Sequence, residues 1–203
     1  MGRRSSAREQ MLTSAVLLFR ERGVDGTALA DVVEHAGAPR GSIYHHFPGG
    51  KAQVAEEATR RAGAAMGAMI GASLAQGDPV ATLRMVVAVF REQLRATDFR
   101  AGCPVAAAAL EGGEYPRARE VAGEAFTAWE QTISAALWQR GLALERARSV
   151  AAMALSSIEG ALLLAKATRG TEPLDRVEAE LGTWVRSLLD ELGTDLQHSE
   201  EQQ

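Results

Sequence analysis

The sequence has little of what builds disulfides, membrane spans or secretion signals. Cys103 is the single cysteine among 203 residues, so no disulfide can form within the chain, which fits a reducing cytoplasm. No apolar run reaches the roughly 18 uncharged residues that a membrane-spanning helix needs. The first six residues, Met-Gly-Arg-Arg-Ser-Ser, lack the apolar segment of a signal peptide. We therefore expect a cytoplasmic protein that does not insert into a membrane.

Aromatic residues and strand patterns are also scarce. Aromatic side chains make up 5% of the chain, whereas hydrophobic residues as a whole make up 46%, much of it alanine, leucine and valine. Alanine and leucine lose little entropy on entering a helix. No run alternates apolar and polar residues in the manner of a half-buried strand. The sequence predicts an all-α fold.

Arrangements typical of enzymes, metal sites and cofactor sites are absent from the sequence. There is no plausible Ser/His/Asp or Cys/His arrangement, no metal-ligand spacing and no glycine-rich phosphate loop. His45 and His46 are adjacent, and adjacent side chains on a helix diverge by about 100°, which disfavours a shared metal. We expect no catalytic residues, no metal and no cofactor.

The charge of the chain is unevenly distributed. The net charge is −4. Residues 1–51 carry seven Lys/Arg and five Asp/Glu, while residues 52–203 carry fifteen and twenty-one. A basic end on an acidic body suits a protein that approaches nucleic acid by that end. We expect a DNA-binding domain over residues 1–51 and an effector-binding and dimerisation domain over residues 52–203.

The N-terminal segment has the pattern of a helix-turn-helix unit. A first helix is predicted over 6–22, with an apolar stripe that ends at Leu18 and Phe19. Thr27 is a suitable N-cap for a second helix, which Gly37 ends. A third helix is predicted from Pro39 to about residue 46. In such a unit the last helix enters the major groove of double-stranded DNA.

The residues around the third helix carry side chains suited to DNA. Arg40, His45 and Pro39 suit base edges, and Gly41 lets the backbone approach the duplex closely. Hydroxyl and ammonium groups suited to phosphates are supplied by Thr27, Ser42, Tyr44 and Lys51. Other roles stay open at this point: Thr27 as a simple helix cap, Tyr44 as a core aromatic, and Arg40 and Lys51 as ordinary surface charges.

Residues 8–54 resemble the N-terminal domain of the TetR family of bacterial repressors. The likeness rests on the spacing of Phe19, Gly23 and Thr27, the Ala36-Gly37-Ala38 turn, and the run from Gly41 to Phe47 that leads to Lys51. It implies a homodimeric repressor whose third helices enter successive major grooves of a near-palindromic operator. It also implies DNA contacts by the following residues: Thr27, Arg40, Ser42, Tyr44, His45 and Lys51.

Later motifs extend the resemblance to the LmrA/YxaF-like branch of that family. They are Gly102-Cys103-Pro104-Val105, Glu111-Gly112-Gly113, and the run from Glu159 to Ala165. One feature departs from the family pattern. The segment Phe47-Pro48-Gly49-Gly50-Lys51 is one residue longer than usual and lacks the serine that caps the fourth helix.

The remaining sequence predicts a helical body, with helices over 51–76, 80–96, 104–111, 115–140, 145–169 and 173–192. The helix over 145–169 is apolar on nearly all sides, and the one over 173–192 carries a heptad-like seam from Leu174 to Leu192. We expect these two helices to form a homodimer interface as a four-helix bundle. The alternative is that both are buried within one monomer.

The body is also expected to bind an unknown small apolar effector. Methionine and aromatic side chains suit an adaptable apolar chamber, and a few polar groups would orient the ligand. The same residues fit an ordinary core, and a ligand-binding helical protein with no DNA-dependent role is the alternative to a regulator. The candidate lining residues are Met66, Met69, Met85, Phe90, Gln93, Phe126, Trp129, Glu130, Met153 and Glu159.

Overall fold

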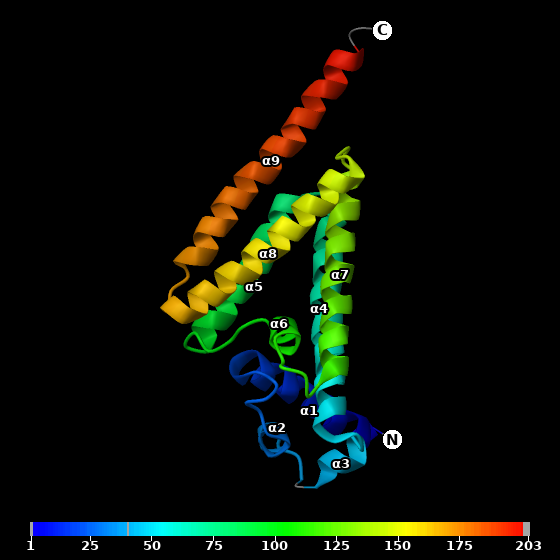
Figure 1. Ribbon diagram of the computed structural model, residues 1–203, viewed down its shortest axis with the longest axis vertical. Coiled ribbons are helices and arrows are strands. Elements are labelled where there is room, and N and C mark those ends of the chain that lie inside the picture. The colour runs from blue at the N-terminus through cyan, green and yellow to red at the C-terminus, as the bar shows by residue number, and fades with distance from the viewer. Residues whose placement is uncertain (1, 40, 201–203) are drawn as a thin grey trace. The chain divides into compact units, whose positions relative to one another are not determined.

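The chain folds into helices joined by short turns (Figure 1). The computed structural model describes residues 2–39 and 41–200, and the side chains of residues 7–39 and 41–192. No strand occurs in these described stretches, which confirms the all-α prediction. The helices are α1 (Gly2–Arg22), α2 (Leu29–His35), α3 (Ser42–His46), α4 (Gly50–Leu74), α5 (Pro79–Ala96), α6 (Pro104–Ala109), α7 (Pro116–Trp138), α8 (Leu144–Thr168) and α9 (Glu172–Glu200).

Several helix ends differ from the prediction: α1 begins at Gly2 rather than residue 6, and most others shift by one or two residues. The N-cap of α2 is Ala28 rather than Thr27, and the Asp31 carboxylate accepts a hydrogen bond from the Ala28 amide at 3.3 Å. Helix α3 begins at Ser42 rather than Pro39, because Gly41 at its N-cap has a φ of 86°, in the left-handed region. Helix α9 continues to Glu200, past the predicted end at residue 192.

The chain divides into two compact units. One, here the head unit, comprises residues 1–66 and 100–126; the other, here the body unit, comprises residues 67–99 and 127–203. The boundary predicted between residues 51 and 52 lies at the start of α4. The contacts instead group α6 and the first part of α7 with the N-terminal helices.

The head unit is built around the predicted apolar stripe of α1. Met11, Ala15, Leu18 and Phe19 are all buried, which confirms the periodicity that defined this helix. Val32 and Val33 of α2 are buried as well, as is Val105 of α6. Burial of each large side chain contributes about 1.5–3 kcal/mol, and the short helices α2 and α3 depend on such packing.

The body unit has its own core, in which α9 packs beside α5 and α8 (Figure 1). A buried cluster joins α5, α7, α8 and α9, and Trp184, Leu188 and Leu192 of α9 pack against it. The seam predicted on this helix therefore packs within the protomer. The buried members of the cluster are Val80, Leu137, Leu142, Ala147, Val150 and Val185.

Glycines on α4 allow close approach of α7. A Cβ at Gly63 would lie 2.7 Å from the Cβ of Ala125, both in the head unit. In the body unit, a Cβ at Gly67 would lie 3.2 Å from Cδ1 of Trp129. Close helix packing therefore favours glycine at Gly63, whereas a side chain at Gly67 would need the Trp129 ring to shift slightly.

Candidate nucleic-acid interface

Helix α3 turns one face to the core and the other to solvent. Ile43 and Phe47 are 3% and 0% exposed and anchor the helix. Tyr44 is 63% exposed, and His45 is exposed beside it. The geometry therefore favours a surface role for Tyr44 over the core role that the sequence left open.

The turn before α3 presents backbone and small side chains. Pro39 and Gly41 are exposed. The Ser42 hydroxyl donates a hydrogen bond to the Pro39 carbonyl at 2.7 Å, and the Ser42 amide donates to the same carbonyl at 3.1 Å. A phosphate contact by Ser42 would require the hydroxyl to rotate away from Pro39, since it has one proton. Arg40, the remaining predicted contact in this turn, lies outside the described residues.

Thr27 is enclosed in the structure. It is 1% exposed, and its hydroxyl donates to the Gly23 carbonyl at 2.8 Å. A phosphate oxygen only accepts hydrogen bonds, so a phosphate contact by this hydroxyl would require the bond to Gly23 to break. In this geometry Thr27 closes the end of α1 and holds the turn before α2.

Lys51 joins the start of α4 to the turn between α1 and α2. Its Nζ donates to the Asp25 carbonyl at 3.1 Å and lies 5.2 Å from the centroid of the Tyr115 ring. An ammonium has three protons, so the bond to Asp25 leaves protons for a phosphate. The contact with Tyr115 is a cation–π interaction that fixes the side chain further.

Gln53 caps the start of α4, where the family pattern has a serine and this chain does not. Gln53 Oε1 accepts a hydrogen bond from the Gly49 amide at 2.9 Å, directly before α4. Its Nε2 donates to Glu57 at 2.9 Å, which fixes the side-chain orientation. Gly50 has a φ of 61° and permits the extra residue in this turn. The longer segment is therefore accommodated without loss of a cap.

Leu29 and Ala30 at the start of α2 line the same surface depression as Tyr44, which the sequence did not indicate. A depression of about 530 Å³ lies between α2 and α3, and Ala30 and Glu34 at its edge are exposed. Leu29, the first residue of α2, is only partly buried. The depression is lined by Leu29, Ala30, Val33, Glu34, Ala38, Gly41, Ile43 and Tyr44.

Comparison with known proteins agrees with this geometry. The family model of bacterial regulatory proteins of the tetR family matches residues 11–58. The model of the LmrA/YxaF-like transcriptional regulator C-terminal domain matches residues 79–180. The chain belongs to the TetR family.

Individual relatives place this TetR-family regulator in the same branch. The HTH-type transcriptional regulator Rv0196 of Mycobacterium tuberculosis is 43% identical over 86% of this chain and 91% of its own length. LmrA of Bacillus subtilis, also an HTH-type transcriptional regulator, is 32% identical over 83% of this chain and 90% of its own length. These families and relatives are transcriptional regulators, not enzymes.

The fold itself matches a solved member of the family. The crystal structure of the regulatory protein TetR from Rhodobacter sphaeroides superposes with a TM-score of 0.77 and is 21% identical in sequence. The match covers 87% of this chain and 97% of that one. The two proteins therefore share a fold.

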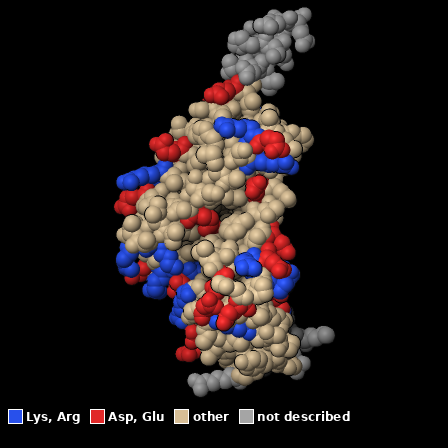
Figure 2. Space-filling model, viewed as in Figure 1, with Lys and Arg blue, Asp and Glu red and all other residues tan. Residues whose placement is uncertain are grey.

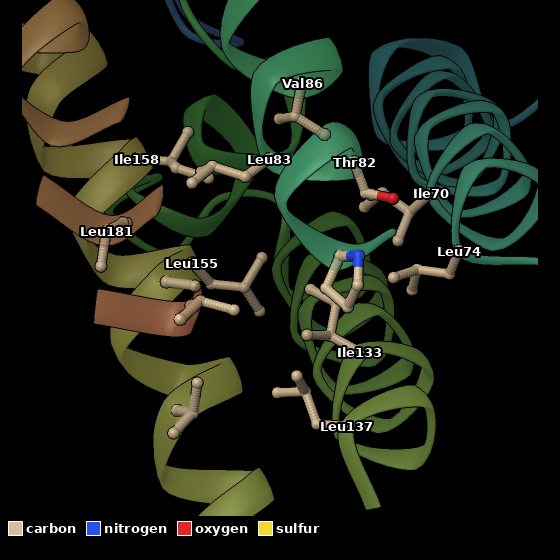
Figure 3. A pocket seen from close by; sticks show the side chains of 14 residues that line it. Ile70, Leu74, Thr82, Leu83, Val86, Ile133, Leu137, Leu155, Ile158 and Leu181 are labelled. Atoms are coloured by element: carbon tan, nitrogen blue, oxygen red, sulfur yellow. The ribbon is translucent and has the colours of Figure 1, made fainter. Parts of the chain in front are cut away.

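The body unit of this TetR-family chain contains a small apolar cavity of about 60 Å³ that is partly open to solvent. Side chains from α4, α5, α7, α8 and α9 point into it (Figure 3). Thr82 is the one lining residue with a polar side-chain group, and its hydroxyl is hydrogen-bonded to Ser73 at 2.8 Å and to the Asp78 carbonyl at 3.2 Å. The lining is Ile70, Leu74, Pro79, Thr82, Leu83, Val86, Ile133, Leu137, Val150, Ala154, Leu155, Ile158, Leu181 and Val185.

None of the ten residues predicted to bind an effector lines this cavity. Phe90 and Trp129 are buried at 4% and 3% exposure, whereas Met153 is 49% exposed. The remaining seven are partly buried: Met66, Met69, Met85, Gln93, Phe126, Glu130 and Glu159.

Helix α8 of this regulator leaves apolar side chains uncovered. By length and composition it could cross a membrane, with a mean hydropathy of 1.5 in a window of which 33% is buried. Met153, Leu163 and Leu164 are 49%, 64% and 56% exposed. Exposed Gly160 and Ala167 continue the same stripe at helical spacing. In Figure 2, atoms over the middle of α8 are largely uncharged.

Proposed function

We propose that this chain is a homodimeric, cytoplasmic repressor that binds a near-palindromic operator through α3 and is released by a small apolar effector. The proposal rests on the two sides of α3, one buried in the core and one exposed to solvent. Ile43 and Phe47 fix the helix in the core, and Tyr44 and His45 face solvent where the major groove would lie. Such anchoring suits a helix that presents side chains rigidly to DNA.

The contacts differ in how directly each residue reaches DNA. We assign base-edge contacts to Arg40, Pro39 and His45, and close backbone approach to Gly41. Tyr44 and Lys51 would contact phosphates, since Tyr44 is exposed and Lys51 keeps protons beyond its bond to Asp25. Ser42 and Thr27 would contact phosphates only after releasing the carbonyl groups that their hydroxyls now bind.

The double substitution Arg40→Ala with Tyr44→Ala tests this assignment. A DNA reader should lose operator binding while its helix content and melting temperature stay unchanged, because Tyr44 is exposed. Retained operator binding by the folded double variant would contradict the assignment. The measurement is fluorescence anisotropy of a labelled operator, with circular dichroism as the control for folding.

We assign the dimer interface to α8 together with α9. The support is the exposed stripe on α8 from Met153 to Ala167, which a monomer leaves in contact with water. Exposed positions of α9 include Ala179 and Thr183, whose small side chains permit close helix approach. The seam of α9 itself is used within the protomer, so a partner would meet the other faces of these helices.

We assign effector binding to the apolar cavity of the body unit. A cavity of about 60 Å³ is far below the roughly 300–1,000 Å³ of typical ligand sites, so a ligand must separate the surrounding helices. Its lining offers no charged group, and its one hydroxyl is already hydrogen-bonded. The ligand should therefore be uncharged and predominantly apolar.

Release of DNA follows if the widened cavity favours a different spacing of the two α3 helices. A ligand shifts such an equilibrium only through its differential affinity for the two states. Titration of candidate apolar ligands into the protein–operator complex tests this step. A ligand that binds the body tightly yet leaves operator affinity unchanged would contradict it.

A further inference from the structure

The Glu111-Gly112-Gly113 motif places a carboxylate on the turn between α1 and α2. Glu111 follows α6, and its Oε1 accepts hydrogen bonds from the backbone amides of Val24 at 3.0 Å and Asp25 at 3.3 Å. These residues are 87 and 86 positions apart in sequence, and all belong to the head unit. One side chain that is distant in sequence thus accepts hydrogen bonds from two backbone amides of the turn between α1 and α2.

The turn that receives Glu111 is shaped to accept it. Gly23 has a φ of 76°, and a Cβ there would lie 3.7 Å from Glu111 Oε1. Val24 is fully buried and Thr27 closes the turn through its bond to Gly23. The backbone between α1 and α2 is therefore fixed on both sides, by the core and by Glu111.

The same segment also holds the start of α4. Tyr115 lies under the Lys51 ammonium, and Lys51 in turn donates to the Asp25 carbonyl. Upstream, the Gly102 amide donates to the Arg20 carbonyl at 2.7 Å. Residues 102–115 therefore contact the end of α1, the following turn and the start of α4, the elements that flank α2 and α3.

We propose that Glu111 is a positioning residue for DNA binding, which holds the turn between α1 and α2 in the shape that the operator requires. This inference rests on the proposed function. It gives the Glu-Gly-Gly motif a role: the glutamate supplies the acceptor, and the two exposed glycines let the chain turn back toward α7. Motion of residues 110–115 would withdraw the acceptor and loosen the elements on either side of α3.

The surroundings of Glu111 favour the protonated form of its carboxyl group. Burial, and next the neighbouring Asp25 side chain, raise the pKa of Glu111. Its second oxygen, Oε2, is buried with no hydrogen-bond partner among the described residues. A proton on that oxygen would let the Glu111 carboxyl act as a donor rather than leave a buried acceptor unsatisfied. The other charged groups near the segment are Lys51, which binds the Asp25 carbonyl, Arg20, whose pKa burial lowers, and the Arg100–Glu21 ion pair.

Two substitutions separate the acceptor from the charge. Glu111→Ala removes the acceptor, and we expect about a tenfold loss of operator affinity and faster hydrogen exchange at the Val24 and Asp25 amides. Glu111→Gln keeps an oxygen for the amides and an amide nitrogen to donate to Asp25. We expect it to retain wild-type affinity and slow exchange. Glu114→Gln, an exposed glutamate in the same segment, is the matched control.

The pH dependence of stability tests the environment of the Glu111 carboxyl group. Because the pKa of Glu111 is raised above its ordinary value of 4.5, the folded chain holds the proton more tightly than the unfolded chain. The free energy of unfolding should therefore fall as the pH rises from about 4.5 through the raised pKa, and Glu111→Gln should remove that part of the fall.

The outcomes distinguish this inference from the proposed function. If Glu111→Ala exchanges the Val24 and Asp25 amides as slowly as wild type, or binds the operator equally well, the inference is overturned. If the wild type binds no operator but Glu111→Ala alone shows fast exchange, the contact stands and the proposed function fails. If the Glu111→Ala chain does not fold, Glu111→Gln decides: fast exchange at the Val24 and Asp25 amides together with wild-type operator affinity in that variant overturns the inference.

Discussion

At the scale of single residues, exposure decides which side chains of α3 are free to read DNA. Tyr44 is 63% exposed although it lies next to the buried Ile43. Its ring lies on the solvent side of a helix that is anchored in the core, so it is free to contact DNA. Thr27, in contrast, is enclosed, and its role in the free protein is to hold the turn before α2.

Tyr44→Ala should weaken operator binding by about 1–2 kcal/mol, or roughly five- to thirtyfold, without lowering the melting temperature. The ring is uncharged, so the dependence of affinity on salt should keep its slope. Anisotropy titrations at several salt concentrations measure both quantities. Trp138→Ala, another exposed aromatic at 55%, is the control and should change neither. A large loss of stability in Tyr44→Ala would contradict the surface assignment.

The glycines of α4 give a matched pair for packing. Alanine at Gly71 would place its Cβ 4.0 Å from Thr132, an ordinary contact, and should stabilise the helix by up to about 1 kcal/mol. Alanine at Gly63 would place its Cβ 2.7 Å from that of Ala125, so the overpacking should exceed the helical gain and lower stability by about 1–2 kcal/mol. Thermal and urea unfolding compare the two, and equal stabilisation would refute the close approach.

At the scale of helices, uncovered surface points to assembly. Helix α8 keeps Leu163 and Leu164 more than half exposed, while the seam of α9 is covered within the protomer. The periodic pattern of α9 was visible in the sequence, but the partner of that pattern was not, because an apolar stripe fits any complementary helix.

The double substitution Leu163→Glu with Leu164→Glu should convert the dimer to a monomer. Two carboxylates would be desolvated at the interface, and loss of the second reader would lower operator affinity by about 10²-fold or more. Sedimentation equilibrium and operator titrations measure these effects. Leu144→Glu, at a leucine 43% exposed near the start of the same helix, should leave the dimer intact. A dimeric double variant would exclude this face as the interface.

The apolar cavity can be tested without knowing the effector. A small cavity with an apolar lining can take up xenon. We expect xenon to shift the NMR signals of methyl groups such as those of Leu83 and Ile158. Ala154→Val should fill the space and abolish the shifts, whereas Ala152→Val, on the same helix but outside the lining, should not. Xenon shifts that persist in Ala154→Val would contradict the assigned cavity.

At the scale of the whole molecule, the sequence predicts the helices better than it predicts what they enclose. Periodicity identified the buried stripe of α1 because a helix repeats its core face every three to four residues. The start of α3 was predicted at Pro39 but lies at Ser42, because Gly41 has a left-handed backbone that is incompatible with the helix. Glu111 and the cavity were missed because each depends on segments far apart in the chain.

The division of contacts brings distant segments of the chain together. Segments before and after residues 67–99 join in the head unit, so α2 and α3 belong to the same unit as α6. This arrangement explains why a motif late in the sequence, Glu111-Gly112-Gly113, contacts a turn near the N-terminus.

The most direct test of the central claim is selection of genomic DNA fragments by the purified protein, followed by a salt titration on the most enriched one. We predict a near-palindromic site whose affinity falls steeply with salt, with a slope that corresponds to about 6–10 phosphate contacts per dimer. Absence of any enriched fragment, with weak binding that is equal for all sequences, would contradict the account of a sequence-specific regulator.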